Sequence, residues 1–187
     1  IYSGTSSLYG KQNLPPFNPN MPADCLNPYS MSKWMGEHVC KLYNQLYGIP
    51  TIVLRYFNVY GPREPLKGNY APVIGLFKRQ LSKGENITIV KPGSQKRDFT
   101  YIDDVVEANI CSMKSYITKF NIYNVGTGTN YSILEVAKLI DSNSSVGISF
   151  IPKRPAEVKE TLADIGKTTK DLGWKPKYNL KDKINDY

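Results

Sequence analysis

The sequence predicts an α/β protein with a partial doubly wound parallel sheet and a smaller α/β lobe. Residues 1–3 resemble the end of a strand, and residues 29–47 have the apolar spacing of a long helix. Residues 51–57 form a nearly continuous apolar run, which is typical of a strand covered on both faces. Strand, long helix and buried strand in succession indicate a parallel sheet with helices on its faces.

The helix predicted at residues 29–47 has recognisable ends. Asn27 can cap its amino end, Pro28 suits its first turn and Gly48 suits its carboxyl end. Apolar residues recur along it at spacings of four and three, and we expect them to form a buried stripe. This stripe consists of Met31, Met35, Val39, Leu42 and Leu46.

Strands and helices continue to alternate along the rest of the chain. Further strands are predicted at residues 87–90, 121–125 and 148–151. Further helices are predicted at residues 72–83, 103–115, from the capping box Ser132–Glu135 onward, and 164–172. The sheet domain is expected to contain residues 1–60 and 98–125. The smaller lobe is expected to contain residues 61–97 and 126–187.

Composition limits the classes of protein to which the chain can belong. Of its 187 residues, 41% are hydrophobic and 21% are charged, as in an ordinary globular protein. No apolar stretch approaches the roughly 20 residues that a membrane span needs, so we expect no membrane association and a cytoplasmic location. The net charge is +8, but the lysines are scattered and no RNP-like motif occurs, which argues against nucleic acid.

The cysteines and the single histidine indicate neither a metal site nor a disulfide. Cys25, Cys40 and Cys111 have neither zinc-ligand spacing nor a C-x-x-C pair, and their number is odd. We expect them to be reduced thiols. His38 lies within the predicted helix and is assigned no role.

The central chemical signal is the pair Tyr29 and Lys33, four residues apart on the long helix. Residues at this spacing share a helix face. An ammonium about 6 Å away stabilises a phenolate by roughly 3 kcal/mol at an effective dielectric near 20, which would make Tyr29 a proton acceptor. The alternative is a surface tyrosine stacked on a lysine stem. Upstream, the hydroxyl of Thr5 follows a strand end, where ligands bind in open α/β sheets.

Six motifs occur in order along nearly the whole chain. They are Y-S-G-T-S-S-L-Y-G, N-P-Y-S-M-S-K, L-R-Y-F-N-V-Y-G-P-R, R-D-F-T-Y-I-D-D-V, Y-N-V-G-T-G and L-G-W-K-P. Together they resemble the extended short-chain dehydrogenases/reductases, specifically the NAD-dependent sugar epimerases and dehydratases. The resemblance implies a Rossmann-type sheet that binds NAD and a lobe that binds the nucleotide sugar.

The front of the family pattern does not occur in this chain. Family members begin with a strand, a G-x-x-G-x-x-G turn and a helix that hold the NAD pyrophosphate, and no such turn is present. We therefore expect a C-terminal fragment that is inactive alone, derived from a protein that forms a homodimer.

The resemblance assigns catalytic and cofactor contacts to four residues. Tyr29 matches the base that takes a proton from a sugar hydroxyl while hydride leaves for the nicotinamide. Lys33 matches the lysine that holds the nicotinamide ribose, and Thr5 matches the residue that bonds the reacting oxygen. Phe57 falls where a residue contacts the nicotinamide end.

The resemblance also implies contacts with a UDP-sugar. The diphosphate and sugar would be contacted by Asn58, Asn69 and Tyr70. The uracil would be flanked by Thr88 and Val90.

Three further residues are expected to hold the phosphates and the nucleotide ribose. Arg97 and Arg154 would clamp the phosphates, which suits the guanidinium fork, and Glu157 would bind the ribose. The alternatives are a salt bridge of Arg97 with Asp98 or Asp103, and an exposed loop charge at Arg154.

The resemblance favours 4-epimerisation of UDP-glucose or UDP-N-acetylglucosamine. Related dehydratases and decarboxylases place an acidic residue after the threonine of the first turn, whereas Ser6 and Ser7 follow Thr5 here. Thr161 lies four positions after Glu157, where a tyrosine restricts other epimerases to glucose and galactose, so we expect an N-acetyl group to fit. The alternatives are a UDP-glucuronate epimerase, decarboxylase or dehydratase, a GDP-sugar enzyme, and a non-catalytic nucleotide-binding relative.

Overall fold

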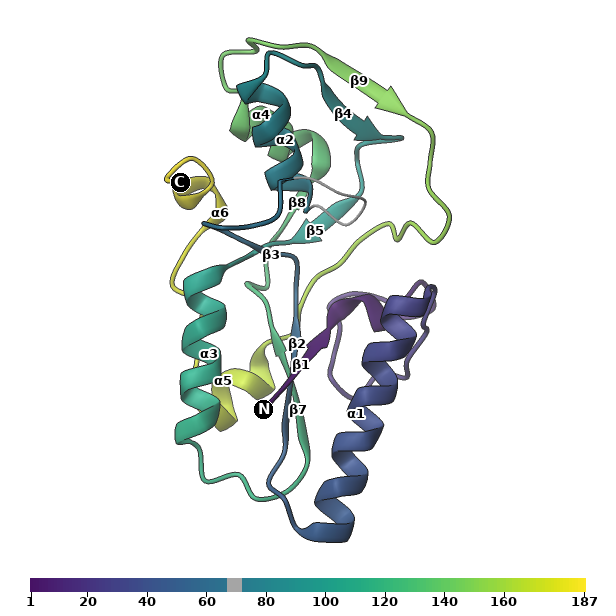
Figure 1. Cartoon of the computed structure of the whole chain (residues 1–187), viewed down its shortest axis with the longest axis vertical. Helices are drawn as coiled ribbons and strands as arrows, with labels where there is room; N and C mark the ends of the chain where they lie inside the picture. Colours follow the sequence, from purple (N-terminus) through teal and green to yellow (C-terminus); the bar gives the residue numbers. More distant parts are fainter. Residues whose placement is uncertain (67–71) are drawn as a thin grey trace.

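A three-stranded parallel sheet forms the lower part of the protein in Figure 1, a computed structural model that describes residues 1–66 and 72–187. Its strands, in the order β1-β2-β7, are β1 (Tyr2–Thr5), β2 (Ile52–Tyr56) and β7 (Asn121–Val125). In register, Tyr56 lies between Thr5 and Val125. The carboxyl ends of all three strands therefore meet at one edge of the sheet.

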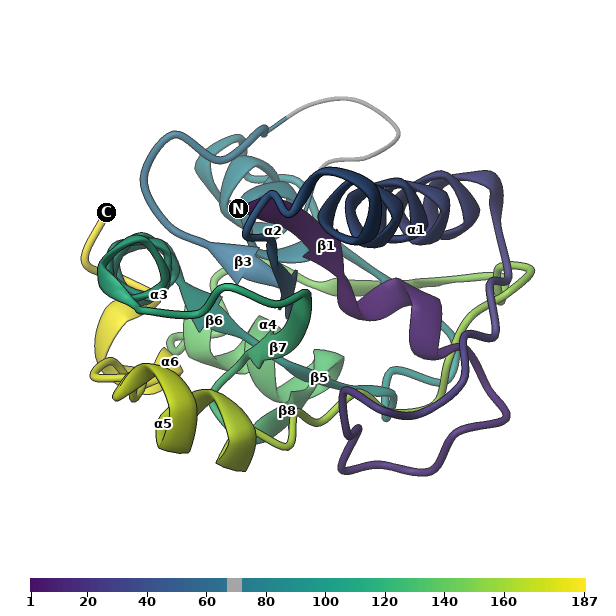
Figure 2. The same ribbon diagram turned by 90° about the horizontal axis from the view of Figure 1, so that it is seen from below.

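Helices cover both faces of this sheet, as Figure 2 shows. α1 (Pro28–Tyr47) packs against β1 on one face, and α3 (Ile102–Lys114) and α5 (Gly166–Leu172) lie on the other. Side chains of β2 point to both faces of the sheet. Ile52 packs in the core beside α3 and α5, whereas Arg55 bonds Glu37 of α1. The predicted α/β class, with a doubly wound parallel sheet, is confirmed.

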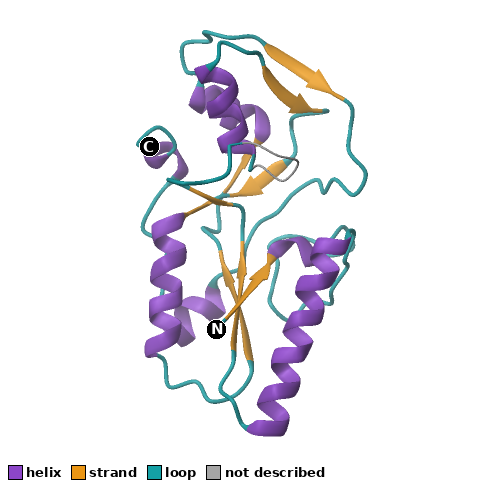
Figure 3. Ribbon diagram, viewed as in Figure 1, coloured by secondary structure: helices purple, strands orange, loops and turns teal. Residues whose placement is uncertain are grey.

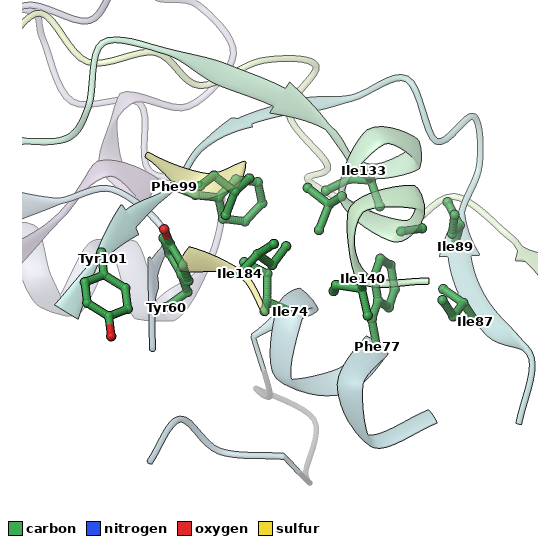
Figure 4. Packing of buried hydrophobic residues seen from close by; sticks show 13 residues of the cluster. Tyr60, Ile74, Phe77, Ile87, Ile89, Phe99, Tyr101, Ile133, Ile140 and Ile184 are labelled. Carbon is green, nitrogen blue, oxygen red and sulfur yellow. The ribbon is translucent and has the colours of Figure 1, made fainter. Parts of the chain in front are cut away.

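A second group of elements packs around its own core (Figure 3). Helices α2 (Val73–Ser82) and α4 (Ile133–Ile140) pack against each other and against β4 (Ile87–Val90). β4 pairs in parallel with β9 (Ile148–Ile151). Figure 4 shows the buried side chains at its centre, among them Ile74, Phe77, Ile89 and Ile140.

Short elements complete the described structure. Parallel strands β3 (Val59–Tyr60) and β6 (Thr100–Tyr101) pair with each other, and β5 (Lys96–Asp98) pairs antiparallel with β8 (Asn130–Ser132). A 3-10 helix η1 (Ser6–Tyr9) follows β1, and α6 (Leu180–Lys183) lies near the carboxyl end. The bounds of these elements were not predicted, because they are short and, unlike Ile87–Val90, contain no continuous apolar run.

The division into residues 1–60 with 98–125 and residues 61–97 with 126–187 stays a prediction. One segment packs differently from that division. Leu172 and Trp174, which follow residue 126, join the core on β2 and β7. The indole Nε1 of Trp174 donates to the backbone oxygen of Asp104 at 2.9 Å, which fixes the segment against α3.

The prediction of a buried stripe on α1 is wrong. Its five residues are exposed, with 62% of Leu46 accessible to solvent. The buried side chains of α1 are Ser30 and Glu37 instead. The spacing located an apolar helix face correctly, but no described element of this chain covers that face.

Among the helices that the structure describes, none is long and apolar enough to span a membrane. Within residues 1–66 and 72–187, no cluster of three or more His, Cys, Asp or Glu side chains could hold a metal ion. Cys25, Cys40 and Cys111 are half-buried free thiols.

Candidate active site

The start of α1 places Tyr29 at the carboxyl edge of the sheet. Asn27 accepts a hydrogen bond from the backbone nitrogen of Ser30 at 2.8 Å, and Pro28 occupies the first turn. This capping box fixes the first turn of the helix, where Tyr29 is 51% exposed. An exposed phenol at this position is accessible to a substrate.

Lys33 lies one turn further along α1 and reaches back to β1. Its Nζ donates to the backbone oxygen of Ser3 at 3.1 Å and lies 5.5 Å from the ring centroid of Tyr2. The helix can approach the strand this closely because Gly36 has no side chain, since a Cβ there would lie 2.0 Å from the Tyr2 hydroxyl oxygen. The ammonium is thereby anchored beside the first strand.

Thr5 ends β1 and caps the following 3-10 helix. Its Oγ1 accepts a hydrogen bond from the backbone nitrogen of Ser7 at 3.2 Å, which leaves its proton available to donate. Because η1 packs against α1, the Thr5 turn and the helix that carries Tyr29 are neighbours. This brings together the elements of the predicted proton-transfer site.

Asn58 follows β2 in a strained conformation with φ of 28°. Its Nδ2 donates to the backbone oxygen of Asp98 at 2.7 Å and to Oγ1 of Thr161 at 3.3 Å. Thr161 Oγ1 also accepts from the backbone nitrogen of Asp98 at 3.2 Å. Two of the predicted substrate contacts, Asn58 and Thr161, are therefore hydrogen-bonded to each other.

A pocket of about 610 Å³ contains six of the residues predicted to contact the substrate. These are Asn58, Thr88, Val90, Arg97, Arg154 and Glu157. Apolar side chains of α2 and α4 complete its wall, including Leu76 and Ile133. A size of this order suits a nucleotide, since small-molecule sites usually occupy about 300–1,000 Å³.

Arg97 and Glu157 form an ion pair in this pocket, where each is largely buried. Arg97 therefore pairs with neither Asp98 nor Asp103, the partners considered from sequence. Burial lowers the pKa of the Arg97 guanidinium, and the Glu157 charge opposes that shift. Arg97 Nη1 also donates to the backbone oxygen of Lys96 at 2.8 Å, so these two partners use part of the guanidinium's five N–H groups.

A smaller hollow of about 180 Å³ joins this pocket to the Thr5 turn. It shares Asn58, Arg97 and Glu157 with the larger pocket and is also lined by Ser7 and Thr161. The predicted sugar contacts thus lie between the turn at the sheet edge and the wider pocket.

Within the described residues, four predicted contacts line neither of these two pockets: Thr5, Tyr29, Lys33 and Phe57. The ring of Phe57 has no exposed surface and packs in tilted contacts against Tyr9 and Phe17, so its contact with nicotinamide stays a prediction. Asn69 and Tyr70 lie outside the described residues.

Sequence reasoning did not single out Gln95, which also lines the larger pocket. Its side-chain nitrogen donates to the backbone oxygen of Val90 at 3.0 Å. A glutamine in a turn between two strands gives no periodic signal, but its position two residues before Arg97 could have marked it.

Residues 1–126 match the sequence profile of the NAD dependent epimerase/dehydratase family. The chain belongs to this family. It is 39% identical over 184 residues to a putative UDP-glucose 4-epimerase from Methanocaldococcus jannaschii, covering 97% of this chain and 59% of that protein.

Solved structures of family members share the fold. A UDP-N-acetylglucosamine 4-epimerase from Methanobrevibacter ruminantium M1, in complex with UDP-N-acetylmuramic acid, is 30% identical with a TM-score of 0.93. That alignment covers 100% of this chain and 60% of the other. A UDP-glucuronic acid 4-epimerase from Bacillus cereus, with UDP-glucuronic acid and NAD, is 32% identical with a TM-score of 0.89. This second alignment covers 97% of this chain and 57% of the Bacillus cereus enzyme. The chain therefore spans about 60% of the length of these relatives.

Proposed function

We propose that this chain is the catalytic and substrate-binding part of an NAD-dependent 4-epimerase of a UDP-hexose, either UDP-glucose or UDP-N-acetylglucosamine. The observation that carries the proposal is the position of Tyr29, half exposed at the start of α1, the helix that packs against the 3-10 helix after Thr5. A hollow leads from the Thr5 turn to a nucleotide-sized pocket that contains Arg97. In this proposal Tyr29 acts on the sugar near the Thr5 turn, and Arg97 binds the diphosphate in the larger pocket.

Each residue has a distinct task in the proposed reaction. Thr5 donates a hydrogen bond to the oxygen on carbon 4, and Tyr29 takes the proton from that oxygen. Loss of this proton, together with the hydride on carbon 4 that NAD would accept, would give a 4-keto sugar. The sugar would turn about its diphosphate, the hydride would return to the opposite face of carbon 4, and Tyr29 would return the proton to the oxygen. Arg97 and Arg154 hold the diphosphate during this turn, while Glu157 binds the nucleotide ribose.

The residues at the sheet edge fit the nicotinamide ribose of NAD. Lys33 lies beside β1 with its ammonium on the backbone oxygen of Ser3, so ribose hydroxyls are suitable further partners for it. NAD, when bound, accepts the hydride from carbon 4 and returns it. The pyrophosphate end would be held by a glycine-rich turn, which this chain lacks, so we propose that the chain alone has no turnover.

The exposed face of α1 suits a second copy of the protein. Apolar stripes at helical spacing that remain exposed usually mark an interaction surface. This face contains Met31, Met35, Val39, Leu42, Leu46 and Tyr47. We propose that the complete enzyme is a homodimer that buries this face.

The function is tested on a complete enzyme, meaning this chain preceded by a glycine-rich cofactor-binding segment. UDP-glucose, UDP-N-acetylglucosamine and UDP-glucuronate are supplied separately, and the products are followed by NMR without added NAD. We expect 4-epimers of the first two sugars. Turnover of UDP-glucuronate alone would contradict the proposed substrate, and a dehydrated or decarboxylated product would contradict the proposed reaction.

A further inference from the structure

A buried ion pair joins the helix of the proposed base to the middle strand of the sheet. Glu37 of α1 and Arg55 of β2 are 2% and 4% exposed. Arg55 Nε donates to Glu37 Oε1 at 3.0 Å, and Arg55 Nη2 donates to Glu37 Oε2 at 2.7 Å. Two parallel hydrogen bonds of this kind fix the orientation as well as the distance of the two partners.

The same guanidinium also holds the turn that begins with Thr5. Its Nη1 donates to the hydroxyl of Tyr9 at 3.0 Å and to the backbone oxygen of Pro19 at 3.1 Å. The Tyr9 hydroxyl donates in turn to Oδ1 of Asn124 on β7 at 2.6 Å. Arg55 is therefore bonded to α1 and to η1 at the same time, and the network reaches β7.

The positions of these partners relate the network to the proposed chemistry. Glu37 lies four residues after Lys33 and eight after Tyr29, so all three share one face of α1. Tyr9 lies four residues after Thr5 and ends the 3-10 helix that Thr5 caps. A shift of Arg55 would therefore change the position of the base relative to its hydroxyl partner.

Stability alone does not explain such a pair. Apolar residues of similar volume often stabilise a protein as well as a buried ion pair does, because desolvation offsets the attraction between the charges. Along α1 the buried side chains are Ser30 in the first turn and Glu37, and much of the remaining surface is exposed. Glu37 is thus the principal buried anchor of the helix body.

We infer that Glu37 and Arg55 are positioning residues that set the distance between the Tyr29 phenol and the Thr5 hydroxyl. This inference rests on the proposed function, because it assigns these two groups to one proton transfer. Neither positioning residue lines the two pockets described above, so their loss should affect the chemical step more than substrate binding.

The test uses Glu37→Gln and Arg55→Lys in the complete enzyme. Glu37→Gln keeps the shape of the side chain but removes its charge, and Arg55→Lys keeps a charge but removes the planar fork. We expect kcat to fall about 10- to 100-fold in each variant, as displacements of about 1 Å can produce, with KM within about threefold of wild type. A kcat within twofold of wild type in both variants would overturn the inference, as would an increase in KM alone.

A matched control separates positioning from general loss of stability. Asp104 of α3 is also a buried carboxylate, it accepts bonds from the backbone nitrogens of Lys177 and Tyr178, and it lines neither of the two pockets. Asp104→Asn should lower Tm without lowering kcat at temperatures well below Tm. A parallel loss of kcat in this control would show that destabilisation alone explains the effect and would overturn the inference.

Two further measurements cover the other outcomes. If the Glu37 and Arg55 variants do not fold, Tyr9→Phe removes only the hydroxyl that bonds Arg55, and an unchanged kcat would contradict the inference.

If the wild type converts no UDP-sugar, the proposed function fails, and the inference is judged by the 13Cζ NMR resonance of Tyr29. We expect that resonance to move in Glu37→Gln and not in Asp104→Asn, and an unmoved resonance in Glu37→Gln would overturn the inference.

Discussion

Arg97 and Glu157 are 60 positions apart in the chain, yet their side chains bind each other in the wall of the larger pocket. Burial lowers the pKa of Arg97, and the charge of Glu157 partly offsets that effect. The carboxylate thus keeps a buried guanidinium oriented before any ligand binds. Little conformational entropy is then lost when a diphosphate binds to it.

We predict that Arg97→Ala lowers the affinity for UDP by about 10- to 100-fold. A hydrogen bond to a charged group contributes about 1.5–3 kcal/mol, and here its loss also leaves the Glu157 carboxylate facing the diphosphate. Isothermal titration of this chain with UDP measures the effect, because the chain supplies the pocket lining that the structure describes. Lys159→Ala is the control, since it removes an exposed charge nearby that lies outside the pocket. Equal losses in the two variants would indicate a general electrostatic effect rather than a phosphate contact.

Tyr29→Phe should reduce kcat of the complete enzyme by at least about 10²-fold, with little change in UDP-sugar binding. The substitution removes only the hydroxyl of a side chain that is already half exposed, so the fold should be unaffected. Steady-state kinetics and unfolding curves are compared with those of Tyr43→Phe, another exposed tyrosine of the same helix. Near-wild-type turnover in Tyr29→Phe would contradict its role as the base.

The chain by itself should bind UDP but should bind NAD no better than millimolar. NAD needs the pyrophosphate contacts of a glycine-rich turn at a helix start, and the sequence contains no such turn. Calorimetry measures the dissociation constants of UDP and NAD on the same preparation. UDP binding then shows that the preparation is folded. A micromolar dissociation constant for NAD would be the contrary result.

Asp98→Ala should lower the free energy of unfolding by about 3 kcal/mol or more. The buried carboxylate accepts from the backbone nitrogens of Thr127, Gly128 and Ala163 at 2.8, 3.0 and 3.1 Å, and all three would lose their acceptor. Urea unfolding measures the change. The control is Asp103→Ala, at an exposed position in the first turn of α3, which should lower the free energy of unfolding by only about 0.5 kcal/mol. Similar values for both variants would show that the Asp98 bonds contribute little.

Sequence reasoning succeeded where a feature depends on neighbouring residues. The cap at Asn27, the left-handed residue Gly48 and the capping box at Ser132 were readable because each motif spans a few positions. The outcome was different for Met35 and Leu46, which are exposed although their spacing indicated burial. Helical spacing identifies an apolar face, but the element that covers it can lie anywhere in the chain or in another chain.

The site showed the same division between local and long-range features. Tyr29 and Lys33 could be proposed as a pair because they lie four residues apart on one helix, and their role stays a prediction. The pairing of Arg97 with Glu157 was missed because it joins segments that are distant in sequence. Arg55 gave a signal that could have been used, because a charge inside an apolar strand must have a buried partner.

Thr161→Tyr should shift substrate preference from UDP-N-acetylglucosamine towards UDP-glucose. Thr161 lines the small hollow together with Ser7 and Asn58, so a phenol there would occupy the space proposed for the N-acetyl group. One missing or added group in a pocket usually changes discrimination by about 10- to 200-fold, so we expect the ratio of kcat/KM values to change by at least tenfold.

The substitution also removes the hydroxyl that bonds Asn58 and the backbone of Asp98, and this second effect needs its own control. Thr161→Val keeps the size of the side chain and removes only those hydrogen bonds. We expect Thr161→Val to lower kcat/KM for both sugars alike, because Asn58 would lose one of its fixed partners. If Thr161→Tyr leaves the ratio unchanged, or if Thr161→Val changes it equally, pocket width at this residue does not select the sugar.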